Sequence, residues 1–153
     1  MKTAMIIASD AGARTAGIIR EELGKEVDLF SVSERSGCVR IDSITDFTLR
    51  HFGDYEAFVF IGAMGICVRA IAPCVTSKYA DPAVVNVDAT GHFVVSVLAG
   101  HVGGANALTE RLARILGAQP VVTTQSDNTG LWALDHSCKD SRSELPFSPF
   151  LHL

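Results

Sequence analysis

The stretch AFVFIGAMGICVRAIAP (57–73) decides the fold class. Its first part, AFVFIG (57–62), is apolar without alternation, which is typical of a strand buried on both faces of a sheet. Its second part, GICVRAIAP (65–73), predicts a short helix that ends at Pro73, because proline has no amide hydrogen and restricts the residue before it. A buried strand followed at once by a helix indicates a parallel α/β sheet.

The same alternation extends toward the N-terminus. We expect strands at 3–9 and 26–32 and helices at 14–24 and 43–53. The apolar stripe of the first helix comprises Ile18, Ile19 and Leu23, and the second helix supplies Phe47 and Phe52 to the core.

Toward the C-terminus the pattern changes. AVVNVD (83–88) and HFVVSVLA (92–99) are separated by three residues that end in glycine, which predicts a β-hairpin. A helix at 104–116, with Leu108, Leu112 and Ile115 on one stripe, and a last strand, QPVVTTQ (119–125), follow. The sequence therefore predicts an α/β, three-layer domain with a mainly parallel sheet, helices on both faces and one inserted β-hairpin.

Composition excludes several classes of protein. Of 153 residues, 48% are hydrophobic and 20% charged, which is typical of a globular chain rather than a disordered one. The net charge is −4 without a block of like charges, so we expect neither a nucleic-acid partner nor an anionic membrane surface. No apolar run approaches the roughly 20 residues of a spanning helix, and the N-terminal apolar stretch is too short for a signal peptide. We therefore expect a cytoplasmic protein.

The cysteines and the last residues carry little functional signal. The four cysteines form no CxxC pair and match no histidine spacing, so no metal site is expected, and Cys67 and Cys74 are interpreted as small core residues. Residues 136–153 have no helical or strand period. We expect an α/β domain at 1–135 and an irregular tail or linker at 136–153.

Ligands of parallel α/β sheets bind beyond the carboxyl ends of the strands. Four segments are expected to meet there, namely ASDAGA (8–13), GAMGI (62–66), AGHVGGAN (99–106) and TTQSDNTG (123–130). Glycines in three of them allow backbone amides to face a ligand.

The GAMGI segment offers a helix N-terminus, with Arg69 one turn further on. Gly62, Gly65 and Arg69 are therefore candidates for holding a carboxylate or phosphate. The spacing matches neither a dinucleotide-binding fingerprint nor a P-loop. The alternative is that the glycines only allow a tight turn.

The segment GHVGGAN (100–106) is more specific. His101 is a candidate proton carrier, since an unperturbed imidazole has a pKa of about 6.5. Gly103 and Gly104 can present amide donors to developing negative charge, and Asn106 adds a donor and an acceptor. The alternative is that the histidine and the asparagine cap their own loop and helix.

Three further sets of polar residues have a turn or capping explanation beside the functional one. Asp88 and His92 flank the hairpin turn and can form a relay. KYADPA (78–83) indicates a turn first, and Lys78 in it is a candidate contact for an anionic ligand. Asp127, between Ser126 and Asn128 at a strand end, is a candidate for binding, and capping or turn formation explains it about as well. No Ser-His-Asp, Cys-His or G-x-S-x-G arrangement supports a covalent hydrolase.

Taken together, these motifs resemble a known family. FIGAMGICVRAIAP, DPAVV, the D-x-x-G-x-F hairpin and GHVGGAN occur in the order found in the N-terminal domain of the cobalt-precorrin-5A hydrolase family of anaerobic cobalamin biosynthesis. The resemblance is close over residues 57–130, and the preceding part is compatible with it.

The resemblance implies a hydrolase that opens the ring-A δ-lactone of cobalt-precorrin-5A and releases acetaldehyde to give cobalt-precorrin-5B. It needs no cofactor, because cobalt arrives in the corrinoid substrate. Family members continue into a C-terminal domain, so we expect the chain to be the N-terminal part and that domain, or other cobalamin-pathway enzymes, to be its partners. From their chemistry, our candidate catalytic residues for this reaction are His101 and Asn106, and our candidate substrate-binding residues are Gly62, Gly65, Arg69, Lys78, Asp88, Gly103, Gly104 and Asp127.

Two other hypotheses stay open. A non-catalytic module that binds a corrinoid, or acts as a scaffold in the same pathway, fits the same motifs. A nucleotide-binding domain is disfavoured, because the phosphate-binding fingerprints are missing.

Overall fold

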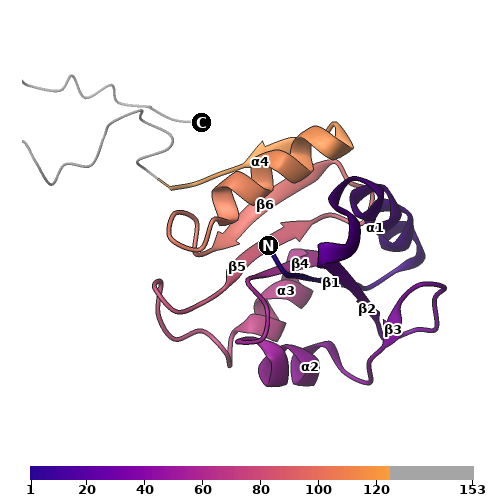
Figure 1. Ribbon diagram of the computed structural model, residues 1–153, viewed down its shortest axis with the longest axis horizontal. Coiled ribbons are helices and arrows are strands. Elements are labelled where there is room, and N and C mark those ends of the chain that lie inside the picture. Colours follow the sequence, from indigo (N-terminus) through magenta and orange to yellow (C-terminus); the bar gives the residue numbers. More distant parts are fainter. Residues whose placement is uncertain (125–153) are drawn as a thin grey trace, which may run out of the picture.

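The computed structural model describes residues 1–124, which form one seven-stranded sheet and its helices (Figure 1). The strands follow the order β3-β2-β1-β4-β5-β6-β7. They are β1 (Thr3–Ile7), β2 (Val27–Ser31), β3 (Val39–Arg40), β4 (Ala57–Ile61), β5 (Ala83–Val87), β6 (Phe93–Leu98) and β7 (Gln119–Val121). The helices are α1 (Asp10–Leu23), the short 3-10 helix η1 (Gly24–Glu26), α2 (Ile44–His51), α3 (Met64–Ile71) and α4 (Ala105–Leu116).

One reversal divides the sheet. Strands β1 to β5 are parallel, β6 pairs antiparallel with β5, and β7 pairs parallel with β6. We call the side on which β1, β4 and β5 end, at Ile7, Ile61 and Val87, the carboxyl side, and the opposite side the amino side. Because β6 and β7 run the other way, their carboxyl ends lie on the amino side.

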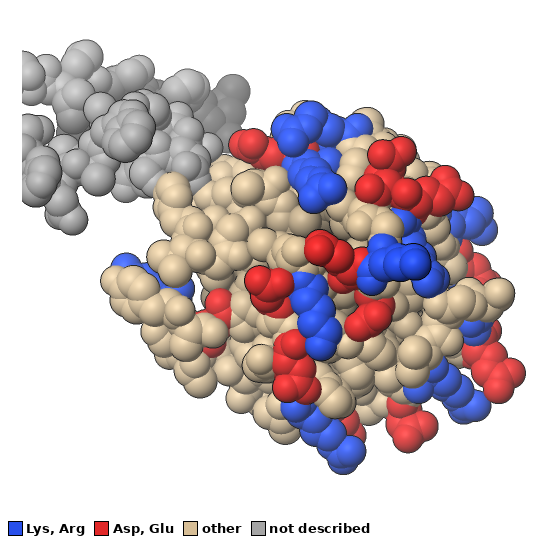
Figure 2. Space-filling model, viewed as in Figure 1, with Lys and Arg blue, Asp and Glu red and all other residues tan. Residues whose placement is uncertain are grey.

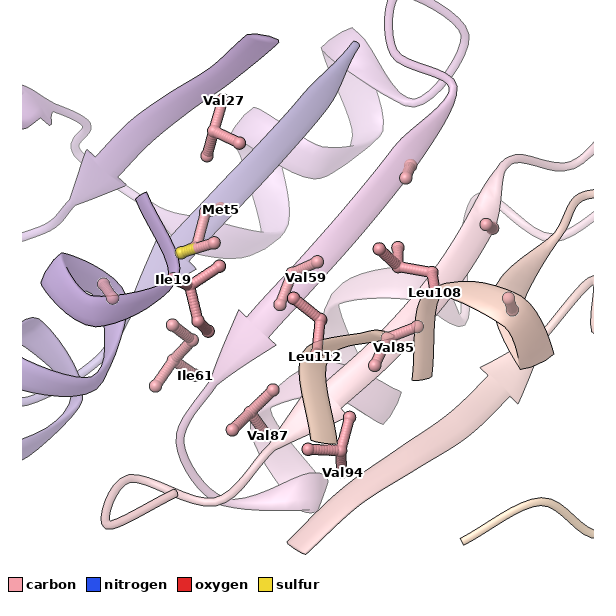
Figure 3. Close-up of a cluster of buried hydrophobic side chains, with 14 of the residues drawn as sticks. Met5, Ile19, Val27, Val59, Ile61, Val85, Val87, Val94, Leu108 and Leu112 are labelled. Carbon is pink, nitrogen blue, oxygen red and sulfur yellow. The ribbon is translucent and has the colours of Figure 1, made fainter. Parts of the chain in front are cut away.

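Helices cover both faces of the sheet, so the predicted three-layer α/β architecture with a hairpin is confirmed (Figure 1). Alternate strand residues point to opposite faces. Met5 and Val59 join a core with α1 and α4, in which Ile19 and Leu112 are fully buried (Figure 3). The other face carries a second core, with α2 and α3, that contains Ile6, Phe58, Phe60 and Cys67.

Several predicted details are wrong for local reasons. Helix α1 begins at Asp10 rather than 14, because the Ser9 hydroxyl caps it by accepting the Gly12 N–H at 3.1 Å. Ile18 is 50% exposed, since the buried stripe runs through Thr15, Ala16 and Ile19 instead. Strand β3 was not expected, because its two residues are exposed and carry no apolar period.

The two predicted core cysteines are buried, as expected for small apolar residues. Cys67 lies on α3 and Cys74 just after it, and both join the α2–α3 core. Burial raises the pKa of the Cys67 thiol to about 12, so this group is unreactive at neutral pH.

No helix within residues 1–124 is long and apolar enough to cross a lipid bilayer. Basic and acidic side chains are interspersed over the face shown in Figure 2, which therefore offers no extended surface of one sign. The predicted tail at 136–153 lies outside the described residues.

Candidate functional site

The structure separates the residues that the sequence predicted to meet. Gly62, Gly65, Arg69 and Asp88 lie on the carboxyl side, after β4 and β5. The segment 99–106 follows β6 and therefore lies on the amino side, so its predicted convergence with GAMGI is wrong. The physical reason is the antiparallel direction of β6, which carries the chain back across the sheet. Asp127, with Ser126 and Asn128, lies outside the described residues.

On the carboxyl side, the turn after β4 is tied directly to β5. The Gly62 N–H donates to the Val87 carbonyl at 2.9 Å, and the Asn86 side-chain amide donates to the Gly62 carbonyl at 3.2 Å. A Cβ at Gly62 would lie 3.0 Å from Cβ of Ala8, so a glycine is needed here for close approach. Asn86 was not predicted, although a single polar residue in the run AVVNV was a signal for it.

The amino terminus of α3 follows this turn and has no side-chain cap at its N-cap residue, Ala63. Arg69 is exposed, and its Nη1 lies 3.0 Å from the position of a Cβ at Gly65. The guanidinium group therefore folds back over the first turn of the helix. Its charge adds to the partial positive charge of the helix terminus, an arrangement that suits a carboxylate.

Asp88 closes the hairpin by accepting four hydrogen bonds. Its Oδ1 accepts from the His92 N–H at 2.7 Å and the Phe93 N–H at 2.5 Å. Its Oδ2 accepts from the N–H of Thr90 at 3.1 Å and from the hydroxyl of Thr90 at 2.5 Å. Burial acts to raise the pKa of Asp88, but these hydrogen bonds outweigh it and hold the pKa below its usual value.

The hairpin also brings His92 beside this network. Nδ1 of His92 lies 2.7 Å from the Thr90 hydroxyl and 3.9 Å from Oδ2 of Asp88. The imidazole is 74% exposed. The predicted proximity of acid and histidine is thus confirmed, with Thr90 between them.

On the amino side, the glycines of the loop 99–104 serve close packing. A Cβ at Gly103 would lie 2.5 Å from Cβ of Ala99, and one at Gly100 would lie 2.7 Å from Oδ1 of Asn106. Gly104 has a φ of 82°, a conformation that favours glycine. Its N–H donates to the His101 carbonyl at 3.3 Å, so this amide is engaged within the loop.

Asn106 connects three parts of the amino side. The residue is only 9% exposed. Its side-chain oxygen accepts from the Ser96 hydroxyl at 2.7 Å, and its side-chain nitrogen donates to the Thr124 hydroxyl at 3.0 Å. It therefore joins β6, the start of α4 and the segment after β7. His101 is exposed on the preceding loop.

The loop before β5 places Lys78 on the amino side as well. Asp81, which is buried, accepts from the N–H and the hydroxyl of Thr76 at 3.1 and 2.9 Å and from the Ser77 N–H at 3.1 Å. This network confirms the predicted turn. Lys78 is exposed, with Nζ 5.0 Å from the centre of the Tyr79 ring.

Two further features bear on ligand binding. A pocket of about 240 Å³ lies along α2, and the charged or titratable residues that line it are Arg40, Asp42, Asp46, Arg50 and His51. Its acidic and basic groups balance, so its charge favours no one ligand class. Within residues 1–124, no group of three His, Cys, Asp or Glu side chains is placed to hold a metal ion.

Comparison with known proteins agrees with the sequence motifs. Residues 46–127 match the family described as "Cobalamin synthesis G N-terminal". The chain is 56% identical over 84 residues to a cobalt-precorrin-5A hydrolase of Salmonella typhimurium, and 50% identical over 76 residues to one of Priestia megaterium. These alignments cover 55% and 50% of this chain but only 24% and 20% of the two relatives, so the chain matches about a quarter of their length or less.

A solved structure shares the fold. The crystal structure of a cobalamin biosynthesis protein G homolog from Sulfolobus solfataricus matches with a TM-score of 0.63 and 27% identity, over 79% of this chain and 36% of that one. The family match covers more than half of the chain and includes every residue predicted for the site. The chain therefore belongs to the cobalamin synthesis G N-terminal family.

Proposed function

We propose that the chain is the N-terminal part of a cobalt-precorrin-5A hydrolase. In this role it helps to open the ring-A δ-lactone of cobalt-precorrin-5A and to release acetaldehyde, giving cobalt-precorrin-5B. The observation that carries the proposal is the 56% and 50% identity to two proteins of that name. The partners would be the remainder of the hydrolase or other cobalamin-pathway enzymes, and the location would be the cytoplasm.

The chemistry of lactone opening matches the kinds of group that the chain offers. A base must take a proton from water, and donors must stabilise the acyl oxyanion. His101 is the proton carrier proposed from the sequence, and its exposure leaves the imidazole within reach of a ligand. Asn106 would act indirectly, because its side chain is engaged with Ser96 and Thr124; its backbone N–H donates to the Gly100 carbonyl, in the loop of His101, at 3.1 Å.

The substrate is a cobalt corrinoid that carries several carboxylates. The uncapped start of α3, with Gly62, Gly65 and Arg69, offers one seat for a carboxylate, and Lys78 offers a separate positive charge on the amino side. Lactone hydrolysis needs no metal bound by the protein in this proposal, since the cobalt enters with the substrate.

The test is to incubate the chain with cobalt-precorrin-5A, alone and together with the remaining part of the Salmonella hydrolase, and to measure acetaldehyde. We expect release in at least one sample. Release in neither sample overturns the proposal.

The matched variants are His101→Ala and His51→Gln. His51 is a partly exposed histidine on α2, paired with Asp54 at 2.8 Å, and belongs to neither group of candidate residues. We expect His51→Gln to keep the rate and His101→Ala to lower it about 100-fold or more. A rate within a few-fold of the unmodified chain after His101→Ala removes that residue from the proposed site.

A non-catalytic corrinoid-binding module is the second candidate, favoured by the chain's match to only 24% and 20% of its relatives. It predicts saturable corrinoid binding without acetaldehyde release in either sample. A nucleotide-binding domain predicts saturable binding of ATP or NAD by calorimetry instead.

A further inference from the structure

We propose that Asp88, Thr90 and His92 form a hydrogen-bond relay that fixes the tautomer of His92, so that Nε2 of His92 accepts the proton of the water that opens the lactone. This inference rests on the proposed function and names His92, on the carboxyl side of the sheet, as the proton acceptor in place of His101. It stands on the hydrogen-bond geometry of the hairpin.

The direction of each hydrogen bond follows from the acceptor at one end. Asp88 is ionised at neutral pH and can only accept, so the Thr90 hydroxyl donates its single proton to Oδ2 at 2.5 Å. The Thr90 oxygen is then left to accept from His92 across 2.7 Å. Neutral His92 must therefore carry its proton on Nδ1 and present Nε2 as an unprotonated acceptor.

The hairpin is held in place from outside. The Thr15 hydroxyl of α1 donates to the Ala89 carbonyl at 2.8 Å. Gly91, with a φ of 73°, packs so closely that a Cβ there would lie 3.3 Å from Cγ2 of Thr15. Because the turn is fixed to a helix on both counts, the relay has a defined position rather than that of a free loop.

The relay also lies on the same side as the carboxylate seat. Asp88 directly follows Val87, whose carbonyl accepts the Gly62 N–H at 2.9 Å at the turn into α3. The five-residue strand β5 separates this side from the loop of His101, a distance of about 17 Å. A substrate anchored at α3 and Arg69 is therefore on the side of His92, not on the side of His101.

The step balances with the groups present. The water oxygen bonds to the acyl carbon while Nε2 takes one water proton, and the bond from the acyl carbon to the ring oxygen then breaks. The leaving oxygen takes the proton back from Nε2, so the products are a carboxylic acid and a hydroxyl group. Asp88 stabilises the transient imidazolium through Thr90 and does not itself accept the proton.

The tautomer is tested first, on the whole chain and without substrate. Nitrogen-15 NMR of the imidazoles distinguishes the protonated from the unprotonated ring nitrogen, and His92→Gln identifies the signal. We expect the proton on Nδ1 in the unmodified chain, a shift toward Nε2 in Thr90→Val, and restoration in Thr90→Ser. A proton on Nε2 in the unmodified chain overturns the relay, whatever the activity.

The catalytic role is tested by acetaldehyde release from the sample that is active in the assay above. We expect His92→Gln to lower kcat about 100-fold or more, Thr90→Val to lower it about 10-fold, and Thr90→Ser and the control His51→Gln to keep it. A normal kcat for His92→Gln overturns the inference and leaves the hydrolase proposal standing. No acetaldehyde from the unmodified protein in any sample overturns both.

Discussion

The two turns that flank β6 are held by different kinds of contact. The hairpin at 88–93 is built by side chains, with the Asp88 carboxylate accepting four hydrogen bonds and Thr90 linking it to His92. The loop at 99–104 is held by close packing. The absence of a Cβ at Gly103 leaves room for Ala99, and its absence at Gly100 leaves room for the side chain of Asn106. The first turn orients a titratable group, whereas the second brings the chain close to itself. The glycine-rich sequence therefore marks close packing here, and the less conspicuous Asp-x-Thr-Gly-His run marks the hydrogen-bonded hairpin turn.

Of the substitutions that test this comparison of the two turns, Gly103→Ala is expected to change stability most. The added Cβ would lie 2.5 Å from Cβ and 2.9 Å from the carbonyl oxygen of Ala99, so the loop must move. We expect the free energy of unfolding to fall by about 3 kcal/mol, measured by urea unfolding followed by circular dichroism.

The matched control is Gly17→Ala on α1, where a Cβ would meet no atom within 4 Å. There we expect a gain of about 0.5–1 kcal/mol, because alanine reduces the entropy of the unfolded chain. Equal stability changes for the two variants would show that close packing does not explain the loop.

A smaller effect on the same loop is expected from Asn106→Ala. The change leaves the hydroxyls of Ser96 and Thr124 without their partner and should lower the free energy of unfolding by about 2 kcal/mol. The imidazole NMR signals of His92 should not change, since that residue lies on the other side of the sheet. A shifted His92 signal would mean that the two turns are coupled.

For the hairpin, Asp88→Asn tests how much the Asp88 carboxylate contributes to stability. The pKa of Asp88 is lowered in the folded chain, so its stabilising contribution is fully present above the unfolded value of about 3.9 and is lost as the pH falls through the folded value. We expect the variant to be about 1 kcal/mol less stable at pH 7, with the difference shrinking below about pH 4. Urea midpoints at both pH values measure this, and a difference that grows on acidification contradicts it.

The smallest effect is expected at Ile18, which the sequence placed in the core. Because Ile18 is 50% exposed, Ile18→Ser should change the free energy of unfolding by less than about 0.5 kcal/mol. A loss above about 1 kcal/mol in the same urea assay would indicate that this face of α1 is covered.

The layers of the fold were predictable because strands that are buried on both faces consist almost entirely of apolar residues. Runs such as AFVFI and AVVNV have no polar alternation, and both strands are buried on both faces. Local capping was less predictable, since the Ser9 cap starts α1 at Asp10, four residues before the predicted start at residue 14. The two residues of β3 gave no signal, because they are held by pairing with β2 rather than by their own burial.

The position of the candidate site was the least predictable part. The sequence offered the residues of GAMGI and GHVGGAN as candidates, but their relative placement depends on the direction of β6, which a hairpin reverses. A rule that holds for the carboxyl ends of parallel strands therefore assigned GHVGGAN to the wrong side. The Thr90 bridge was not foreseen either, since it depends on side-chain rotamers around a turn.

The direction of β7 also sets the minimum length of polypeptide after Thr124 that is needed to reach the hairpin of His92. Because β7 runs parallel to β6, Thr124 lies on the amino side, bonded to Asn106. Polypeptide that continues from Thr124 starts about 17 Å from His92, the height of a five-residue strand. At about 3.3 Å per extended residue, at least five or six residues are needed before it can cover the hairpin. A linker shortened below that length would restrict the following polypeptide to the side of His101.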